Sequence, residues 1–545
     1  MTQLCLRGLM VVMTLTAGLL TAINVGQFLP SRYLPVLGLA DLNSPEVKPV
    51  KMEVRNKILC HSLVDPALPL QSFLRTVDVP PGHVSEAQRL VAKGTWRDAG
   101  HWPKNLAIYD FYQWIAKYKI QSPKRLVAFS DDPENSLLTP EATLNFFYTP
   151  ETGENDLHSM EALKSVRDFK PTMVLLGNLF PRLHDPQLAM SNLFDVLEDG
   201  GYAFLSAPLT GVSDKLPFHF YHSTWTGLAT LMNRSGFEVL EMRRWGNLDY
   251  EVEISKLNSE PKSDDLTNLQ HQRFHEDFAW GLFRKSAAKY NQTCFGTSTR
   301  WLQHWAYTAS ETMNLWNVIE PSMRGRPTMT DDAFKNVILA AGILRNSSDF
   351  PRAPAILHYK QILRTYSNEI KAIPQLLSFG GAEYELHLGP HQRRVVDFGP
   401  YRGTSGDLHK LSLEDLTSKL APGTAGVDFC ILGQTLEHLY DPYLAVQNLF
   451  DVTAPCGFLF TSTPFANIPH MMPHHHYHYS SMGLAMLFHR AGFEVVEIGQ
   501  WGSQEYLSKL FQTMRWPGRG TLQNLEGDAS VVAQVWGFFR KPCKN

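Results

Sequence analysis

Glycines and a carboxylate in the second half of the chain have the spacing of a cofactor site. The apolar run from Gln375 to Phe379 predicts a buried strand and leads directly into Gly380 and Gly381. The next apolar run ends on Asp397, 17 residues after Gly380 (397 − 380). Glycine lets the backbone turn tightly against a ligand, and a carboxylate at about this spacing accepts hydrogen bonds from a ribose diol. The pattern therefore predicts a nucleotide-type cofactor site.

Further polar groups follow at the ends of later predicted strands. Asp407 and Leu408 come shortly after Asp397, and the apolar run that ends at Gly433 is followed by a loop. That loop carries Gln434, Glu437 and His438. Open α/β sheets bind ligands at the carboxyl ends of their parallel strands. We therefore expect all of these groups to lie along one edge of a sheet.

The stretch from Cys430 to Trp501 occurs twice in the chain. The repeated pairs are Asp185 and Asp441, Gly236 and Gly492, and Trp245 and Trp501, each 256 positions apart (441 − 185, 492 − 236, 501 − 245). This period is far too long for a solenoid repeat. It predicts a tandem duplication of a whole domain, with strands alternating with helices in each copy.

The first copy lacks the groups that carry chemistry in the second. Ser130 stands in the position of Gly380, Phe147 in that of Asp397, and Pro181-Arg182 in that of Glu437-His438. Asp156-Leu157-His158 survives as the partner of Asp407-Leu408-His409. A half that keeps its packing residues while losing these groups is expected to be a pseudoenzyme.

A histidine-rich loop follows the next predicted strand of the second copy. Its members are His470, His474, His475, His476 and His478. Imidazole titrates near neutral pH and can deprotonate a hydroxyl or amine. The first copy keeps the partners of His475 and His478, which favours a structural role for those two. His474 and His476, replaced by phenylalanine there, are the better catalytic candidates.

Three alternatives remain open for these histidines. His438 either takes part in catalysis or substrate contact, or it stabilises its loop. Metal binding is a further reading of the cluster, but the loop has no cysteine partner and no regular ligand spacing. We therefore predict no metal site.

The order of these motifs resembles the class I S-adenosylmethionine-dependent methyltransferases, type 11 in particular. The resemblance is carried by LLSFGGAEYEL, RRVVDFGP, SGDLHKL, VDFCILGQTLEHLYDP, APCGFLFTSTPF and GFEVVEIGQWG, between about Ile373 and Lys541. It departs from the family at Ser378, Ala382 and Tyr384, where the family carries an acid and two glycines.

The resemblance implies two tandem Rossmann-like domains, each a doubly wound, mostly parallel sheet, and S-adenosylmethionine as cofactor. It implies that Gly380 and Gly381 face the methionine end of the cofactor and that Asp397 faces its ribose. Asp407 and Leu408 would face the adenine. Gln434, Glu437 and His438 would line the edge shared by cofactor and substrate.

Composition and terminal sequence set the wider organisation. The 545 residues are 44% hydrophobic and 19% charged with a formal charge of −3, which fits globular domains and gives no general reason to bind nucleic acid. Six scattered cysteines are too few to predict a disulfide framework or a zinc ribbon, and Cys430 is predicted to be core. Leu9 to Leu29 is an uncharged, mostly apolar run of 21 residues, long enough for a signal anchor, with a cleaved signal peptide as the alternative.

We therefore expect five segments: an anchor at 1–30, a stem at 31–100, a degenerate domain at 101–290, a helical linker at 291–349 and a cofactor-binding domain at 350–545. Sequons at Asn233, Asn291 and Asn346 permit a location in the secretory pathway. The leading hypothesis is a single-pass membrane methyltransferase acting on a glycan or a small molecule. The alternative is a non-catalytic scaffold in which both halves serve as binding surfaces.

Overall fold

The computed structural model describes most of the chain from residue 77 onward. The described residues are 77–92, 102–120, 125–130, 144–147, 156–177, 179–210, 217–257, 266, 268–272, 275–285, 309–324, 352–370, 375–380, 382–385, 387–388, 393–398, 408–411, 414, 425–472, 474–523, 525–528 and 531–543. The apolar run Leu9 to Leu29, and with it the predicted anchor, lies outside them. Among the residues described, none of the helices combines the length and apolar character needed to cross a bilayer.

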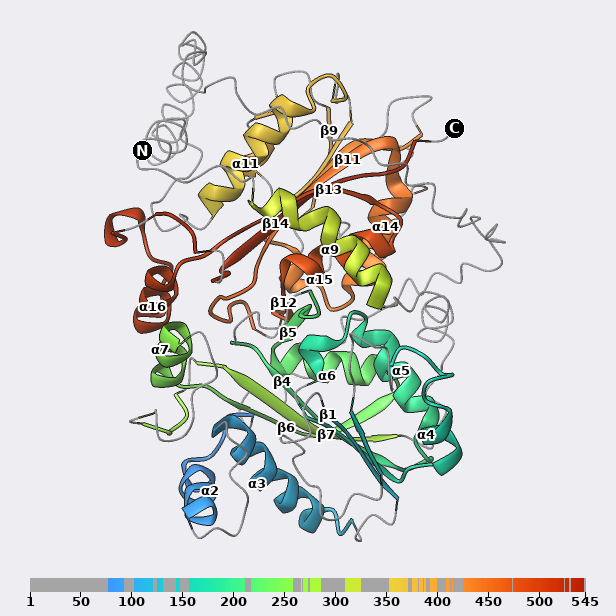
Figure 1. Ribbon diagram of the computed structural model, residues 1–545, viewed down its shortest axis with the longest axis vertical. Coiled ribbons are helices and arrows are strands. Elements are labelled where there is room, and N and C mark those ends of the chain that lie inside the picture. The colour runs from blue at the N-terminus through green and yellow to red at the C-terminus, as the bar shows by residue number, and fades with distance from the viewer. Residues whose placement is uncertain are drawn as a thin grey trace, which may run out of the picture. The chain divides into compact units, whose positions relative to one another are not determined.

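The first half forms a mixed six-stranded sheet with the order β2-β1-β3-β4-β7-β6 (Figure 1). Its strands are β1 Leu126–Ser130, β2 Leu144–Phe147, β3 Met173–Gly177, β4 Tyr202–Pro208, β6 Phe237–Trp245 and β7 Phe278–Lys285. Pairings among β1, β2, β3 and β4 are parallel, and β7 runs antiparallel to both β4 and β6. The helices are α2 Pro81–Ala92, α3 Trp102–Lys117, α4 Lys164–Phe169, α5 Pro186–Val196, α6 Trp225–Arg234 and α7 Leu248–Leu257, with a short 3-10 turn, η3, at Phe180–Arg182.

The second half repeats this arrangement as β9-β8-β10-β11-β14-β13, with the same parallel and antiparallel pairings. Its strands are β8 Gln375–Phe379, β9 Arg393–Phe398, β10 Val427–Gly433, β11 Thr453–Pro464, β13 Glu494–Trp501 and β14 Gln534–Arg540. Its helices are α11 Arg352–Thr365, α12 Ala382–Glu385, α14 Pro442–Val452, α15 Ser481–Arg490 and α16 Gln504–Thr513, with 3-10 turns η7 Leu408–Lys410, η8 Leu436–His438 and η9 Arg519–Thr521.

Several elements recur at the spacing found in the sequence. The helices α5, α6 and α7 begin 256 residues before α14, α15 and α16 (442 − 186, 481 − 225, 504 − 248). Local signals explain why they begin there. Asp185 and Asp441 each accept a hydrogen bond from the backbone N–H three residues on, and each is followed by proline at the first helical position.

Both faces of the first sheet are covered. Along β1 and β3, Leu126, Ala128, Met173 and Leu175 pack in one apolar cluster with α2 and α3, while their neighbours Val127, Phe129, Val174 and Leu176 pack in another with α5 and α6. This period of two is what a strand buried on both faces requires. The mixed α/β class predicted from the sequence is confirmed.

Some described residues fall in segments that the sequence analysis assigned elsewhere. Val77 and Val79 are buried and α2 packs on α3, although Val77, Val79 and α2 all precede residue 101. Helix α9, Ala309–Arg324, lies in the expected linker and packs on α15 and β13. The first folded half therefore includes residues 77–92.

A two-stranded ladder joins the two halves. β5, Tyr221–Ser223, pairs antiparallel with β12, Tyr477–Tyr479, and His222 lies opposite His478. Figure 1 shows this pair between the two large sheets. The first-half residues His219 to His222 and their second-half counterparts thus meet at the contact, which gives the residues shared by the two halves a structural role.

The described cysteines take two forms. Cys456 and Cys543 form a disulfide, and Cys430 is a free, buried thiol in β10. The prediction that Cys430 belongs to the core is confirmed.

Candidate functional site

The backbone bend at Gly380 tolerates only glycine. Gly380 follows β8 directly, has a φ of +62° and is exposed. A Cβ at this position would lie 2.4 Å from the carbonyl oxygen of Gly433 at the end of β10. The Thr435 hydroxyl sits beside the bend and donates to the carbonyl oxygens of Phe379, at 3.3 Å, and Gly433, at 3.1 Å. The ends of two neighbouring parallel strands are therefore closely packed behind an exposed turn.

The predicted ribose carboxylate comes from the next strand. Asp397 pairs with Ser378 in the β8–β9 ladder, one residue before β9 ends. In the first half, the residue paired with the equivalent Ala128 is Asn145. By strand pairing, the first-half residue equivalent to Asp397 is therefore Asn145. The sequence comparison had assigned Phe147, which lies two residues further along β2. Gly381 and Asp407 lie outside the described residues.

Gln434 begins the loop after β10 in a strained conformation. Its φ is +49°. Its backbone N–H donates to the Ser462 carbonyl at 2.8 Å, and its side-chain amide donates to the Ser462 hydroxyl at 3.2 Å. The buried Tyr384 hydroxyl reaches the same Ser462 hydroxyl at 2.8 Å. Ser462 and Tyr384 were not among the predicted site residues, although Tyr384 was noted as a departure from the family's glycines.

The Ser378 position keeps a carboxylate close to the bend. The Ser378 hydroxyl is buried and donates to a carboxylate oxygen of Glu385. Glu385 belongs to α12, which follows the bend directly. The resembled family has an acid at the Ser378 position, and here the carboxylate of Glu385 lies next to Ser378 instead.

Glu437 is completely buried on η8. One of its carboxylate oxygens accepts a hydrogen bond from the Thr463 hydroxyl at 3.0 Å. The other, Oε1, has no hydrogen-bond partner among the described residues and lies 3.8 Å from Nε2 of His438. Burial raises the pKa of Glu437 to about 7, because a charged carboxylate is poorly solvated there.

His438 holds the histidine-rich loop in place. Its Nδ1 donates to the carbonyl oxygen of His474 at 2.6 Å. In the first half Arg182 donates to the corresponding carbonyl of Phe218 at 3.2 Å. The loop-stabilising reading of His438 therefore has direct support in both halves. Burial lowers the pKa of His438 to about 3, so its imidazole is neutral at physiological pH.

The two predicted catalytic histidines of the loop lie differently. The His474 side chain is half-buried, and its backbone N–H donates to Met471. His476 is fully buried; its N–H donates to the Glu437 carbonyl at 2.7 Å and its carbonyl accepts from Thr224 of the first half. His476 therefore lies at the contact between the halves.

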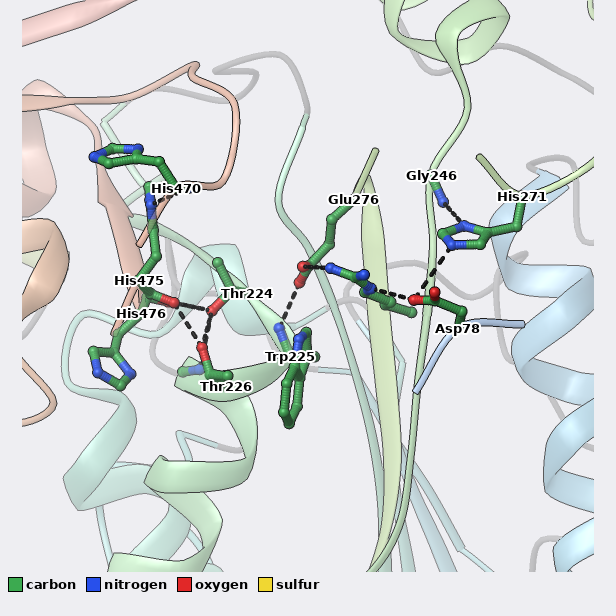
Figure 2. A network of polar contacts seen from close by, with 12 residues as sticks. Asp78, Thr224, Trp225, Thr226, Gly246, His271, Glu276, His470, His475 and His476 are labelled. Carbon is green, nitrogen blue, oxygen red and sulfur yellow. Dashed lines mark hydrogen bonds and ion pairs between the residues drawn. The ribbon is translucent and has the colours of Figure 1, made fainter. Parts of the chain in front are cut away.

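The first half fixes the backbone of this loop (Figure 2). The Thr226 hydroxyl donates to the His475 carbonyl at 2.6 Å, and the Thr224 hydroxyl contacts the same oxygen. Next to them, the Trp225 N–H donates to Glu276 at 2.6 Å, and Glu276 in turn pairs with Arg244. The loop is thereby connected to the core of the first sheet.

The retained Asp-Leu-His sequence has a packing role in both halves. His158 and His409 each accept, through Nε2, the backbone N–H of the aspartate that caps the following helix, both at 3.3 Å. The carbonyls of Leu157 and Leu408 each accept from an asparagine of that helix, both at 2.9 Å. The Leu408 side chain is buried in the core. These contacts give the Leu-His pair the same packing role in both halves.

Comparisons with known proteins give only distant likenesses. No protein-family model matches the chain, and neither does any curated protein. A SAM-dependent methyltransferase from Archaeoglobus fulgidus matches at a TM-score of 0.23 and 15% identity, over 37% of this chain and 99% of that one. The N-methyltransferase NodS from Bradyrhizobium japonicum, in complex with S-adenosyl-L-homocysteine, matches at 0.23 and 15%, over 42% and 99%. The [4+2]-cyclase SpnF matches at 0.22 and 12%, over 34% and 81%. Likenesses with TM-scores this low do not identify a reaction, and the strand order and the side chains are the stronger guide to function.

Proposed function

We propose that residues 350–545 form an S-adenosylmethionine-dependent methyltransferase domain. The observation that carries the proposal is the exposed, left-handed bend at Gly380. It packs against the end of β10, at the carboxyl ends of the parallel strands β8 to β11. Ligands of α/β sheets bind at this edge, where a backbone without side chains can approach them closely. Asp397 on the neighbouring strand reaches the same edge.

In this proposal, each residue of this edge binds a different part of the cofactor. Gly380 and Gly381 would face the methionine end of the cofactor, Asp397 the ribose, and Asp407 the adenine. Leu408, which was expected to face the adenine as well, has its side chain in the core instead. Gln434 would lie towards the acceptor, and the buried Glu437 would support this edge of the sheet from inside. When bound, the sulfonium supplies an activated methyl group, so the protein's main task is to align donor and acceptor. His474, whose side chain is half-buried, is the candidate for removing the acceptor proton. His438, with a pKa of about 3 and its Nδ1 bound to the His474 carbonyl, holds the loop. His476 contributes through the backbone of the loop.

We propose further that the first half is a duplicated, non-catalytic copy. The shared strand order and the elements repeated at 256 residues support this origin. The half retains the contacts that hold the histidine-rich loop through Thr224 and Thr226. Its role is to position that loop.

Calorimetry on the whole chain tests the cofactor assignment. Titration with S-adenosylhomocysteine should show one saturable site, and Asp397→Ala and Gly380→Ala should each abolish binding. Asp407→Asn should weaken binding at least tenfold, or about 1.4 kcal/mol. Asp156→Asn, the matched change in the first half, should leave the affinity unchanged. Absence of binding at millimolar ligand would refute the proposal.

A non-catalytic scaffold is the second candidate. Tyr384 favours it, because its buried ring takes a position at which the resembled family has glycine, and it packs on Tyr359 and Phe460. A scaffold predicts no binding of S-adenosylhomocysteine by either half. The calorimetric experiment therefore separates the two functions.

We also propose a membrane-anchored location in the secretory pathway, with a glycan or small-molecule acceptor. The disulfide between Cys456 and Cys543 supports an oxidising compartment, because such bonds are rare in the cytosol. Sensitivity of the expressed protein to an N-glycosidase, lost in an Asn291→Gln/Asn346→Gln variant, tests this location. Full solubility after alkaline extraction of membranes would contradict the anchor.

A further inference from the structure

Three imidazoles of the second half meet beside Glu437. They are His438, His470 and His475, and one ring nitrogen of each lies within 4.8 Å of the others. His438 comes from η8, whereas the other two come from the loop after β11. The irregular spacing in sequence had argued against a metal site. The fold removes that objection, because it adds a ligand from another strand end.

Hydrogen bonds on the far side of each ring orient the three histidines. Nδ1 of His438 donates to the His474 carbonyl at 2.6 Å, and Nδ1 of His470 donates to the Ile468 carbonyl at 3.1 Å. Since carbonyls only accept, both rings carry their proton on Nδ1 and direct the Nε2 lone pair elsewhere. Nδ1 of His475 accepts from the His470 backbone N–H at 3.1 Å, so its proton is on Nε2 and is shared with His478 at 2.8 Å. Metal-binding histidines are oriented by such partners.

The first half provides an internal comparison. It keeps the histidine pair, since Nε2 of His219 lies 2.9 Å from Nε2 of His222, as in the His475–His478 pair. It replaces His438 by Arg182, which makes the same bond to the loop carbonyl. Holding the loop therefore does not require an imidazole at position 438. Unlike the arginine, His438 also has a second ring nitrogen, Nε2, whose lone pair can bind a metal ion.

Glu437 completes the set. Its Oε1 is fully buried, has no hydrogen-bond partner among the residues described and lies 3.8 Å from Nε2 of His438. A buried carboxylate oxygen without a donor is costly unless a cation or a donor satisfies it. Proline replaces this residue in the first half. The groups unique to the second half are thus gathered at one point.

We propose that His438, His470 and His475, with Glu437 beside them, bind a Zn²⁺-like transition-metal ion. The ligand atoms are Nε2 of His438, Nε2 of His470 and Nδ1 of His475. At a Zn–N distance of about 2.0–2.1 Å, tetrahedral ligands stand roughly 3.4 Å apart. The ring nitrogens must therefore approach one another by up to about 1.4 Å. The backbone N–H of His470 must also release Nδ1 of His475. His470 is half-buried, so its ring has room to rotate. Three nitrogens and one carboxylate suit Zn²⁺ or Co²⁺ better than Mg²⁺ or Ca²⁺.

Metal titration of the whole chain tests the site. After treatment with a chelator and its removal, the protein should take up one equivalent of Zn²⁺, and Co²⁺ should give the visible absorption of a nitrogen-ligated tetrahedral ion. His475→Asn and His470→Asn should each weaken Zn²⁺ binding about tenfold or more. Glu437→Gln should weaken it and alter the Co²⁺ spectrum.

His219→Asn is the matched control. It breaks the same type of histidine pair in the first half and should leave Zn²⁺ stoichiometry and affinity unchanged. Equal loss of metal from His219→Asn and His475→Asn would overturn the proposal, as would less than a tenth of an equivalent in the wild-type chain. Circular dichroism of each variant excludes unfolding as the cause. The titration needs no S-adenosylhomocysteine, so its outcome is independent of the cofactor experiment.

Discussion

Glu437 shows how one buried side chain depends on its surroundings. Its carboxyl group accepts a hydrogen bond from the Thr463 hydroxyl and is enclosed by protein. Burial raises the pKa of Glu437 by more than its hydrogen bonds lower it, so the pKa rises from 4.5 to about 7. The native state therefore holds a proton on Glu437 at pH values where the unfolded chain has released it.

This linkage gives a stability prediction. Because the folded pKa lies above the unfolded one, the stabilising effect of protonated Glu437 is fully present below pH 4.5 and is lost as pH rises through about 7. A shift of this size corresponds to about 3 kcal/mol. In the presence of a chelator, wild type should therefore lose about this much unfolding free energy relative to Glu437→Gln between pH 4.5 and 8. Parallel pH profiles for the two proteins would show that the carboxyl group is solvated in the native state.

At the scale of elements, two equivalent ion pairs between helix ends join the two halves. Arg234 at the end of α6 pairs with Asp441, the cap of α14, and Arg490 at the end of α15 pairs with Asp185, the cap of α5. These partners are separated by the repeat distance (490 − 234 = 441 − 185 = 256). All four side chains are at least nine-tenths buried. In each half, an arginine at the C-terminal end of one helix thus pairs with the aspartate that caps a helix of the other half.

Close backbone approach reinforces this junction. A Cβ on Gly227 of α6 would lie 2.1 Å from the His476 carbonyl, and a Cβ on Gly483 of α15 would lie 2.1 Å from the Phe220 carbonyl. Both glycines are needed because another backbone passes directly over the helix. The junction therefore has approximate two-fold character, as in an isologous dimer interface.

Removing one partner of a buried ion pair leaves an uncompensated charge, at a cost of about 3–5 kcal/mol. Arg234→Met should therefore lower stability by this amount in denaturant unfolding, and Arg490→Met should act similarly. Arg234→Met/Asp441→Asn should recover most of the loss, because asparagine still caps α14 while the unpaired charge is gone. A double variant as unstable as the single one would show that the arginine contributes through packing instead.

Across the whole molecule, the disulfide joins the start of β11 to the end of the chain. Cys456 and Cys543 are 87 residues apart, and between them lie α15, β13, α16 and β14. Closing a loop of this length restricts the unfolded chain, and disulfides of this kind contribute about 2–5 kcal/mol. The disulfide thus stabilises the half that contains the candidate site.

The matched substitution Cys456→Ser/Cys543→Ser should lower the thermal midpoint of the oxidised protein, and the two proteins should converge once a reductant is added. Differential scanning calorimetry with and without reductant measures this. Cys430→Ser is not the appropriate control, because Cys430 is buried in the core. A substitution of exposed Met471 serves instead and should leave the midpoint unchanged. No difference between oxidised wild type and the serine variant would contradict the prediction.

Site residues could be predicted from the sequence where their role depends on neighbouring residues in the chain, but not where it depends on contacts between separate elements. Gly380 was predicted correctly at a tight turn, because a glycine after an apolar run specifies local backbone geometry. The position of Asp397 in the first half was misassigned to Phe147, since strand register is set by pairing with β1 and not by counting along the chain. Ser462, Thr463 and Glu385 were missed because their contacts join separate elements.

The sequence alone determined the repeat, the mixed α/β class, the buried strands and the glycine turn. These depend on periodicity and on the local preferences of single residues, which act over a few positions. Only the tertiary structure showed that His438, His470 and His475 meet, that His476 lies at the contact between the halves, and that Thr224 and Thr226 hold the loop. The order of the strands in the second sheet places His438 beside the loop after β11, and contacts between the halves bring Thr224 and Thr226 to that loop. Local spacing in the sequence specifies neither grouping.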